Sequence, residues 1–218
     1  MTDVIPIRFS PKFLEKFGNA VAEWWNDKWK KTTLYYKTDG IHMNDPRELL
    51  TAEFVPDSKT EIFLNGLQPY SNDMKAYLVH KYILKDRKFK YVSDSIQWHI
   101  VEKWQTPQQT IDLGFQGDCE DASLLWLKLV ELAKIPSFRC KICCGYVKTN
   151  GGQAGHAYGT YLTEEGNRWV SMDLTYYTNL LKVEDRAAVK DISRYKAIWF
   201  SFNKKIIWSQ KDMEVKIA

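Results

Sequence analysis

The sequence predicts an α+β protein in which helices come first along the chain and strands follow. Several segments before Pro136 carry apolar residues at helical spacing. After Pro136, three stretches rich in β-forming residues are separated by two turn signals, Asn150-Gly151-Gly152 and Thr163–Gly166. We therefore expect a helical part followed by strands joined as hairpins.

The bulk composition indicates a soluble globular chain. It has 218 residues, of which 44% are apolar and 27% charged, enough for one domain or one domain with an appendage. The net charge of +4, without a dense basic stripe, argues against a nucleic-acid partner. No signal peptide and no apolar run of about 20 residues is found, so we expect no membrane partner.

The four cysteines, which include the neighbours Cys143 and Cys144, fit a reducing compartment better than a disulfide framework. We expect a cytoplasmic protein, or one made in a cell and then incorporated into a virion or another larger assembly.

A tryptophan-rich helix is predicted over Ser10–Lys31, with Ser10 as N-cap and Pro11 at the first helical position. Such an apolar stripe is normally a buried face, and the alternative is a surface for an assembly partner. Residues 32–70 contain turn signals and a candidate strand, Thr32–Lys37, but no motif. We expect residues 1–70 to form an N-terminal extension packed on a catalytic domain of residues 71–218.

Further helices are predicted over Asp73–Lys85 and Asp94–Trp104 from the spacing of their apolar residues. The segment Thr106-Pro107-Gln108-Gln109 then reads as a capping box with proline at the first helical position. It opens a short helix that Gly114 closes.

The helix that carries Cys119 is the most informative segment. Asp118 is a good N-cap, Asp121 follows three residues later as in a capping box, and Pro136 ends the helix. Cys119 therefore falls in the first turn. Unpaired N–H groups and the positive end of the helix dipole stabilise a thiolate there and can donate to an oxyanion.

The neighbours of this thiol work against that effect. Asp118, Glu120 and Asp121 place three carboxylates around Cys119, and their negative charge disfavours a thiolate. The site would then need a protonated histidine or a bound cation. The alternative is that Cys119 is a small buried apolar residue.

Three strands are predicted over Arg139–Lys148, His156–Leu162 and Asn167–Leu174. The first contains Cys140, Cys143 and Cys144. We interpret these cysteines as buried strand residues; the alternative is a metal site at the C-x-x-C spacing, which lacks a second ligand pair.

The second turn fixes a register for the last two strands. If the turn is Thr163–Gly166, Leu162 faces Asn167 and His156 faces Asp173. Directly opposed residues share one face of a sheet. Asp173 could then orient His156, and His156 could act as base for Cys119, although each alone is more often a structural residue.

Four motifs give the second half of the chain a resemblance to bacterial transglutaminase-like cysteine peptidases of the papain-like superfamily. They are Trp104–Gly114, Gly117-Asp-Cys-Glu-Asp-Ala122, Gly155-His-Ala-Tyr and Trp169-Val-Ser-Met-Asp173. The resemblance implies a papain-like α+β fold with the cysteine helix packed on an antiparallel sheet. It also implies Cys119 as nucleophile, His156 as base and Asp173 as orienter.

Some relatives bind calcium near the acidic residues around the cysteine, so the resemblance makes Asp118, Glu120 and Asp121 candidate Ca²⁺ ligands; no cofactor is otherwise required. Three carboxylates are an incomplete set, since Ca²⁺ takes 6–8 oxygens. Gln116 and Trp104 are the weak candidates for a second oxyanion donor.

The resulting hypothesis is a thiol-dependent acyl-transfer enzyme acting on a peptide or side-chain amide of a protein or peptide substrate. Hydrolysis would make it a protease or amidase, and an amine acceptor would make it a transglutaminase. The alternative is a structural or interaction subunit of a larger assembly, for example a viral one, with weak or no activity on the same scaffold.

Overall fold

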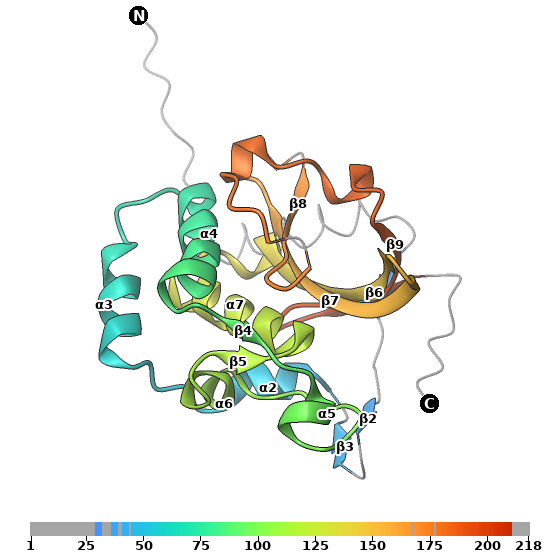
Figure 1. Cartoon of the computed structure of the whole chain (residues 1–218). Helices are drawn as coiled ribbons and strands as arrows, with labels where there is room; N and C mark the ends of the chain where they lie inside the picture. The colour runs from blue at the N-terminus through green and yellow to red at the C-terminus, as the bar shows by residue number, and fades with distance from the viewer. Residues whose placement is uncertain are drawn as a thin grey trace, which may run out of the picture.

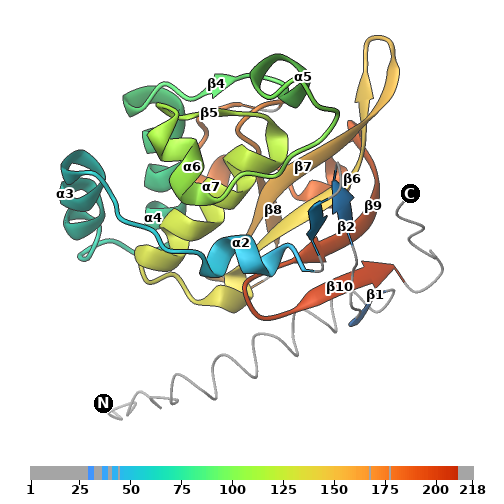
Figure 2. The same cartoon turned by 90° about the horizontal axis from the view of Figure 1, so that it is seen from below.

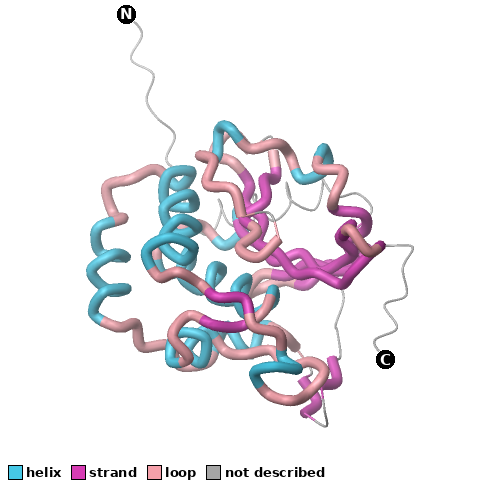
Figure 3. The backbone as a smooth tube through the Cα atoms, in the orientation of Figure 1, coloured by secondary structure: helices cyan, strands magenta, loops and turns pink. Residues whose placement is uncertain are grey.

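A computed structural model describes residues 29–31, 36–38, 41–43, 45–166, 168–176 and 178–210. The α+β class is confirmed: the helices gather on one side and a six-stranded sheet lies on the other (Figures 1 and 3). Most of the predicted helix over Ser10–Lys31 lies outside the described residues. At its end the prediction is wrong, because Trp29–Lys31 form strand β1 and pair with the last strand.

The α-helices of the described residues lie between Arg47 and Leu132. They are α2 (Arg47–Thr51), α3 (Ser58–Gly66), α4 (Asn72–Lys81) with a π-helical turn (Tyr82–Asp86), α5 (Asp94–Gln97), α6 (Pro107–Asp112) and α7 (Cys119–Leu132). Three short 3₁₀ turns follow at Ser137–Arg139, Val183–Asp185 and Val189–Asp191.

The main sheet is antiparallel throughout and has the order β1-β10-β9-β6-β7-β8. Its other strands are β6 (Cys140–Thr149), β7 (Gly152–Leu162), β8 (Trp169–Met172), β9 (Tyr195–Phe202) and β10 (Ile207–Gln210). Two small pairs lie apart from it: β2 (Tyr36–Thr38) with β3 (Ile41–Met43), and β4 (Lys90–Tyr91) with β5 (Gln116–Gly117).

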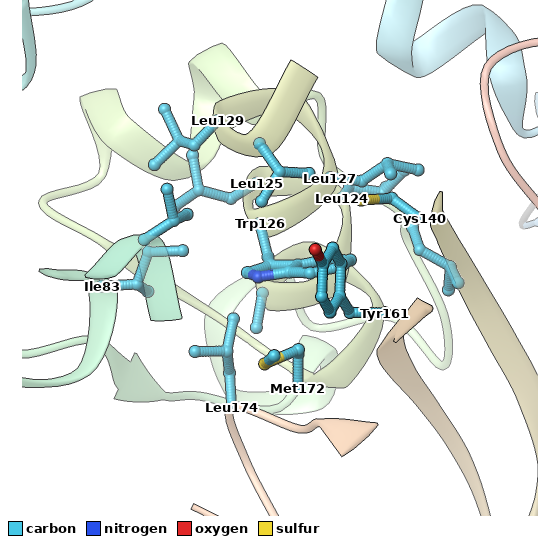
Figure 4. Packing of buried hydrophobic residues seen from close by; sticks show 14 of the residues in the cluster. Ile83, Leu124, Leu125, Trp126, Leu127, Leu129, Cys140, Tyr161, Met172 and Leu174 are labelled. Atoms are coloured by element: carbon cyan, nitrogen blue, oxygen red, sulfur yellow. The ribbon is translucent and has the colours of Figure 1, made fainter. Parts of the chain in front are cut away.

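The core lies between α7 and the sheet. Trp126 is fully buried at its centre, and Figure 4 shows its indole beside Tyr161 and Met172 from β7 and β8. The other buried apolar side chains of α7 are Ala122, Leu124, Leu125, Leu127, Leu129 and Val130. Every residue of α7 from Glu120 to Val130 is buried, as in a helix that other elements enclose on all sides.

The described part of the predicted extension packs on this core through the buried side chains of Leu50, Leu64 and Leu67. Lys128 of α7 also donates through Nζ to the carbonyl of Leu50, at 2.9 Å. The division of the chain at residue 70 stays a prediction.

Two of the three middle helices form as expected. The helix over Asp73–Lys85 is confirmed as α4 and its π-helical turn, and the capping box before α6 is confirmed through Thr106 and Gln109. No helix of the described ranges combines the length and apolarity that crossing a bilayer requires.

The helix predicted over Asp94–Trp104 is too long, because α5 ends at Gln97. The Asp94 carboxylate accepts the N–H of Lys103, and Lys103 Nζ lies 3.3 Å from the centroid of the Trp98 ring. These contacts close the segment into a loop. Ile96 and Val101, which the helical pattern placed on a buried face, are 71% and 87% exposed.

The strand register differs from the expected one by two residues. Leu162 pairs with Trp169 rather than with Asn167, and Gly159 pairs with Met172. A shift by an even number leaves every side chain on its own face of the sheet. His156 and Asp173 therefore stay on a common face, although they are not directly opposed.

The close approach of β7 to α7 depends on Gly159. A Cβ built there would lie 2.6 Å from Cε3 of Trp126. We expect Gly159→Ala to lower the free energy of unfolding by about 1–3 kcal/mol, because the indole would have to move within a packed core. Denaturant unfolding measures this. Gly151→Ala in the open β6–β7 turn, where nothing lies within 4 Å, is the control and should change it little.

Candidate active site

The cysteine is held at the first turn of α7 by the residues just before it. Strand β5 ends at Gly117, Asp118 is the N-cap, and Asp121 Oδ2 accepts the Asp118 N–H at 3.2 Å, as in the predicted capping box. Gly117 is needed for this arrangement, since a Cβ there would lie 2.4 Å from the same Asp121 oxygen. The glycine thus lets the Asp121 carboxylate fold back over the start of the helix.

Three groups lie beside the Cys119 sulfur. The thiol donates to Glu120 Oε2 at 3.1 Å, and the backbone N–H of Ala157 in β7 points to Sγ at 3.5 Å. The imidazole of His156 lies close enough to Cys119 to interact with it electrostatically. The helix start and β7 therefore meet at the sulfur.

His156 is bound on its other side by Asp173. Nε2 lies 2.8 Å from Asp173 Oδ2, and both side chains are buried. Since Nε2 faces the carboxylate, Nδ1 is the ring nitrogen left for the sulfur. The structure thus brings together the three residues that the sequence singled out, in the order thiol, imidazole, carboxylate.

Asp173 is fixed by more than the histidine. It follows the last residue of β8, and its Oδ1 accepts the backbone N–H groups of Thr175 and Tyr176, both at 2.9 Å. Its Oδ2 also accepts the Tyr195 hydroxyl at 2.9 Å. Sequence reasoning missed Tyr195, which lies 22 residues further along the chain and reaches the site only because β9 pairs with β6.

The electrostatic environment favours an imidazolium–carboxylate pair. Burial alone would lower the pKa of His156, but the hydrogen bonds to Asp173 and Cys119 and their charges raise it to about 10. Burial would raise the pKa of Asp173, but the His156 hydrogen bond and charge, with the two backbone donors, hold it below 3.8. The pair is therefore ionised at neutral pH.

Two aromatic rings lie beside the imidazole of His156. Tyr158 stacks near it with ring centroids 5.7 Å apart, and Tyr176 lies tilted at 5.8 Å. Tyr195 stacks in turn on Tyr158 at 4.1 Å. Such packing limits the ring to one orientation.

Both candidates for a second oxyanion donor are engaged elsewhere. Gln116 Nε2 donates to the carbonyl of Leu113 at 2.9 Å, and Trp104 Nε1 donates to Glu102 Oε1 at 2.8 Å. Their role in stabilising an oxyanion stays a prediction.

The acidic residues near Cys119 belong to a larger cluster than the sequence indicated. Ligand atoms of Asp94, Asp118 and Asp121 lie within 4.8 Å of one another, and so do those of Asp94, Glu102 and Glu120. Asp94 and Glu102 come from the loop around α5, at no recognisable spacing from the cysteine. The fold alone reveals them, because β4 pairs with β5 and brings that loop beside the start of α7.

Burial of so many carboxylates makes their charged forms costly. Burial, with the charges of Asp94 and Glu102, raises the pKa of Asp118 to about 7; burial and the charge of Asp118 raise that of Asp121 to about 8. Burial also raises the pKa of Glu120 well above 4.5. Asp118 Oδ1 and Glu120 Oε1 are buried without a hydrogen-bond donor. Buried anionic oxygens of this kind fit a cation that takes oxygen ligands, such as Ca²⁺.

The remaining cysteines are buried strand residues, as interpreted from the sequence. Burial raises the pKa of the thiols of Cys140, Cys143 and Cys144, and the Cys143 sulfur lies 3.6 Å from the Thr160 hydroxyl. The groups of neighbouring metal-ligating side chains in the described part of the chain include none of these three.

No protein-family model matches the sequence, and no curated protein matches it. Solved structures do. LapG from Legionella pneumophila superposes with a TM-score of 0.54 at 18% identity, over 75% of this chain and 84% of that chain. Calcium-bound LapG from the same organism matches with a TM-score of 0.54 at 19% identity, over 79% of this chain and 90% of that one.

LapG is a transglutaminase-like cysteine protease, so this chain has a papain-like, transglutaminase-like fold. At this level of identity the likeness is one of fold.

The His156–Asp173 pair should make the folded protein less stable as the pH becomes alkaline. The folded pKa of His156, about 10, lies above its ordinary value of 6.5. The pair therefore stabilises the fold fully below pH 6.5, and this contribution disappears as pH rises through 10. Between pH 7 and pH 10 we expect the free energy of unfolding to fall by at least ~1 kcal/mol more in the native protein than in Asp173→Asn. Urea unfolding at both pH values measures the difference, and equal slopes would contradict the assignment.

Proposed function

We propose that this protein is a thiol-dependent acyl-transfer enzyme that cleaves or transfers a peptide or side-chain amide. The observation that carries the proposal is the convergence of three groups: Cys119 at a helix start, the imidazole of His156 beside it, and Asp173 Oδ2 2.8 Å from His156 Nε2. Nucleophile, base and orienter are the set that this chemistry needs.

The reaction begins from a thiolate–imidazolium pair, in which the Cys119 proton lies on His156 Nδ1, and the sulfur attacks the amide carbonyl carbon. Backbone N–H groups of the first turn of α7 can donate to the oxygen that becomes negative. His156 then gives its proton to the leaving amine as the C–N bond breaks, which leaves a thioester. Water or a second amine then attacks the thioester while His156 takes its proton, the C–S bond breaks, the acyl product leaves, and the thiolate is restored. Asp173 holds the imidazole and stabilises its protonated form throughout.

An exposed strand edge supports a peptide as substrate. β8 pairs with β7 only from Gly159 to Leu162, so in the described part of the chain no strand lies beside residues 152–158 on that side. Residues 152–155 are exposed and belong to a hairpin that extends beyond the rest of the sheet (Figure 2). The exposed stretch ends at His156.

The direction of the backbone groups on this edge follows from two hydrogen bonds. The Ala157 N–H points away from β6 to the Cys119 sulfur, and the N–H of Lys148, which opposes Gln153, points away from β7 to the Arg194 carbonyl at 2.8 Å. Backbone groups alternate along a strand, so Gln153 and Gly155 direct their N–H and C=O to the free edge. An extended peptide could pair with them and place an amide beside Cys119.

Substitution of the three residues tests the chemistry. We expect Cys119→Ala and Asp173→Asn each to lower kcat/KM on a peptide library by about 10³-fold or more, the first because the nucleophile is lost and the second because the imidazole is no longer held in the right tautomer. Mass spectrometry of the products distinguishes hydrolysis from amine transfer. Iodoacetamide labelling should be fastest at Cys119 and slow at the buried Cys140. Full turnover in Cys119→Ala would sink the proposal.

We also propose that the acidic cluster holds Ca²⁺. Asp118 and Glu120, together with Asp94 and Glu102, supply the oxygen ligands, and Asp121 lies against them as the helix cap. When bound, the cation would neutralise carboxylates that otherwise disfavour negative charge on Cys119. Glu120, whose Oε2 accepts a hydrogen bond from the Cys119 thiol, would then face the cation as well as the sulfur.

Thermal unfolding tests this proposal. At a free Ca²⁺ concentration 100 times Kd, binding to the folded state adds about 2.7 kcal/mol. That corresponds to a rise in Tm of roughly 5–10 °C for a chain of this size. Asp118→Asn should remove most of the rise, whereas Asp86→Asn, which changes an exposed acid outside the cluster, should keep it. An equal rise in both variants would exclude this cluster as the origin.

A further inference from the structure

A second histidine lies behind the candidate site. His80, near the end of α4, is fully buried, and its Nε2 lies 2.8 Å from the backbone carbonyl oxygen of Asp173. Its Nδ1 lies 3.3 Å from Nη2 of Arg186, which is also buried. Neither residue touches Cys119 or His156 in these contacts, and no motif in the sequence pointed to them.

The hydrogen-bond partners fix the state of this imidazole. A guanidinium can only donate, so His80 Nδ1 must accept from Arg186. The remaining proton then lies on Nε2, which donates to the Asp173 carbonyl. Burial and the Arg186 charge lower the pKa of His80 to about 4. A neutral ring with one tautomer therefore persists at neutral pH.

Arg186 connects the same unit to the loop after β8. Its Nη1 donates to the Ser171 carbonyl at 2.6 Å, Nη2 to the Asn179 carbonyl at 3.1 Å, and Nε to the Leu181 carbonyl at 2.9 Å. The guanidinium thus gathers backbone oxygens from both sides of Asp173, and His80 adds the carbonyl of Asp173 itself.

We propose that His80 is a positioning residue for the Cys119–His156–Asp173 site, with Arg186 setting its tautomer. Asp173 lies just beyond the last paired residue of β8, so strand pairing does not fix its backbone. The Thr175 and Tyr176 N–H groups hold its carboxylate, and His80 holds its carbonyl. Together they set the direction from which Asp173 meets His156. The catalytic consequence rests on the proposed function.

The tautomer is tested without any activity measurement. The chain has four histidines, so ¹⁵N-histidine labelling gives few signals, and His80→Gln identifies those of His80. We expect His80 to show a protonated Nε2 and an unprotonated Nδ1, unchanged between pH 5.5 and pH 8. Titration within that range, or a proton on Nδ1, would overturn the assignment.

The positioning role is tested with a pair of variants. His80→Leu removes the donor, whereas His80→Gln keeps an N–H that can reach the Asp173 carbonyl. In the leucine variant we expect kcat and the rate of Cys119 alkylation by iodoacetamide to fall roughly 10- to 100-fold with KM unchanged, as for other groups that orient an active-site ligand. The His156 Nε2–H proton signal should also shift. His80→Gln should restore most of kcat and most of the alkylation rate.

Thr60→Val is the matched control, because it removes another buried hydrogen bond of the helical layer, the one from Thr60 to the Tyr82 hydroxyl at 2.9 Å. It should lower stability without moving the His156 signal. If His80→Leu does not fold, His80→Asn, whose amide is too short to reach, replaces it. Native alkylation and an unmoved His156 signal in a folded donor-free variant would refute the positioning role. Turnover in Cys119→Ala would instead refute the proposed function and leave the tautomer result standing.

Discussion

The contact between the first turn of α7 and strand β7 determines the geometry of the whole site. Gly159 lets the Trp126 indole lie against β7, which sets the distance between the helix and the strand. Two residues before Gly159 on the same strand, the Ala157 N–H points to the Cys119 sulfur, and His156 directly precedes Ala157. Packing in the core and alignment of the reactive groups are thus one constraint, since the helix cannot shift along β7 without moving the thiol relative to the imidazole.

Charge divides the surroundings of the sulfur into two halves. On the side of β7, the His156–Asp173 pair holds an oriented imidazolium that can stabilise a thiolate, with aromatic rings beside it. On the side of the α5 loop, buried carboxylates hold protons or a cation, and Glu120 Oε2 accepts a hydrogen bond from the thiol. The sulfur therefore lies between two competing partners, and the state of the carboxylates decides how freely the thiol can turn to the histidine.

Local patterns predicted what depends on local physics. Capping residues and apolar spacing located α4, α6 and α7, and turn signals located β6, β7 and β8, because helix ends and turns are determined by a few adjacent residues. The helix predicted over Asp94–Trp104 is wrong beyond Gln97, because the Asp94 carboxylate accepts the N–H of Lys103, nine residues later, and closes a loop that no periodicity encodes. The sequence did not reveal four further residues for the same reason, since each reaches the site through pairing or packing of distant elements. They are Asp94, Glu102, Tyr195 and His80.

The β7–β8 register has a consequence for how this sequence can change over time. His156 and Asp173 share a face of the sheet, and their hydrogen bond depends on the present pairing of Gly159 with Met172. A slide of β8 along β7 by one residue would turn the carboxylate to the opposite face of the sheet. A slide by two residues would keep the face but move the carboxylate about 7 Å along the strand. Insertions and deletions at the turn of residues 163–166 are therefore expected only where the loop takes them up and leaves this pairing unchanged.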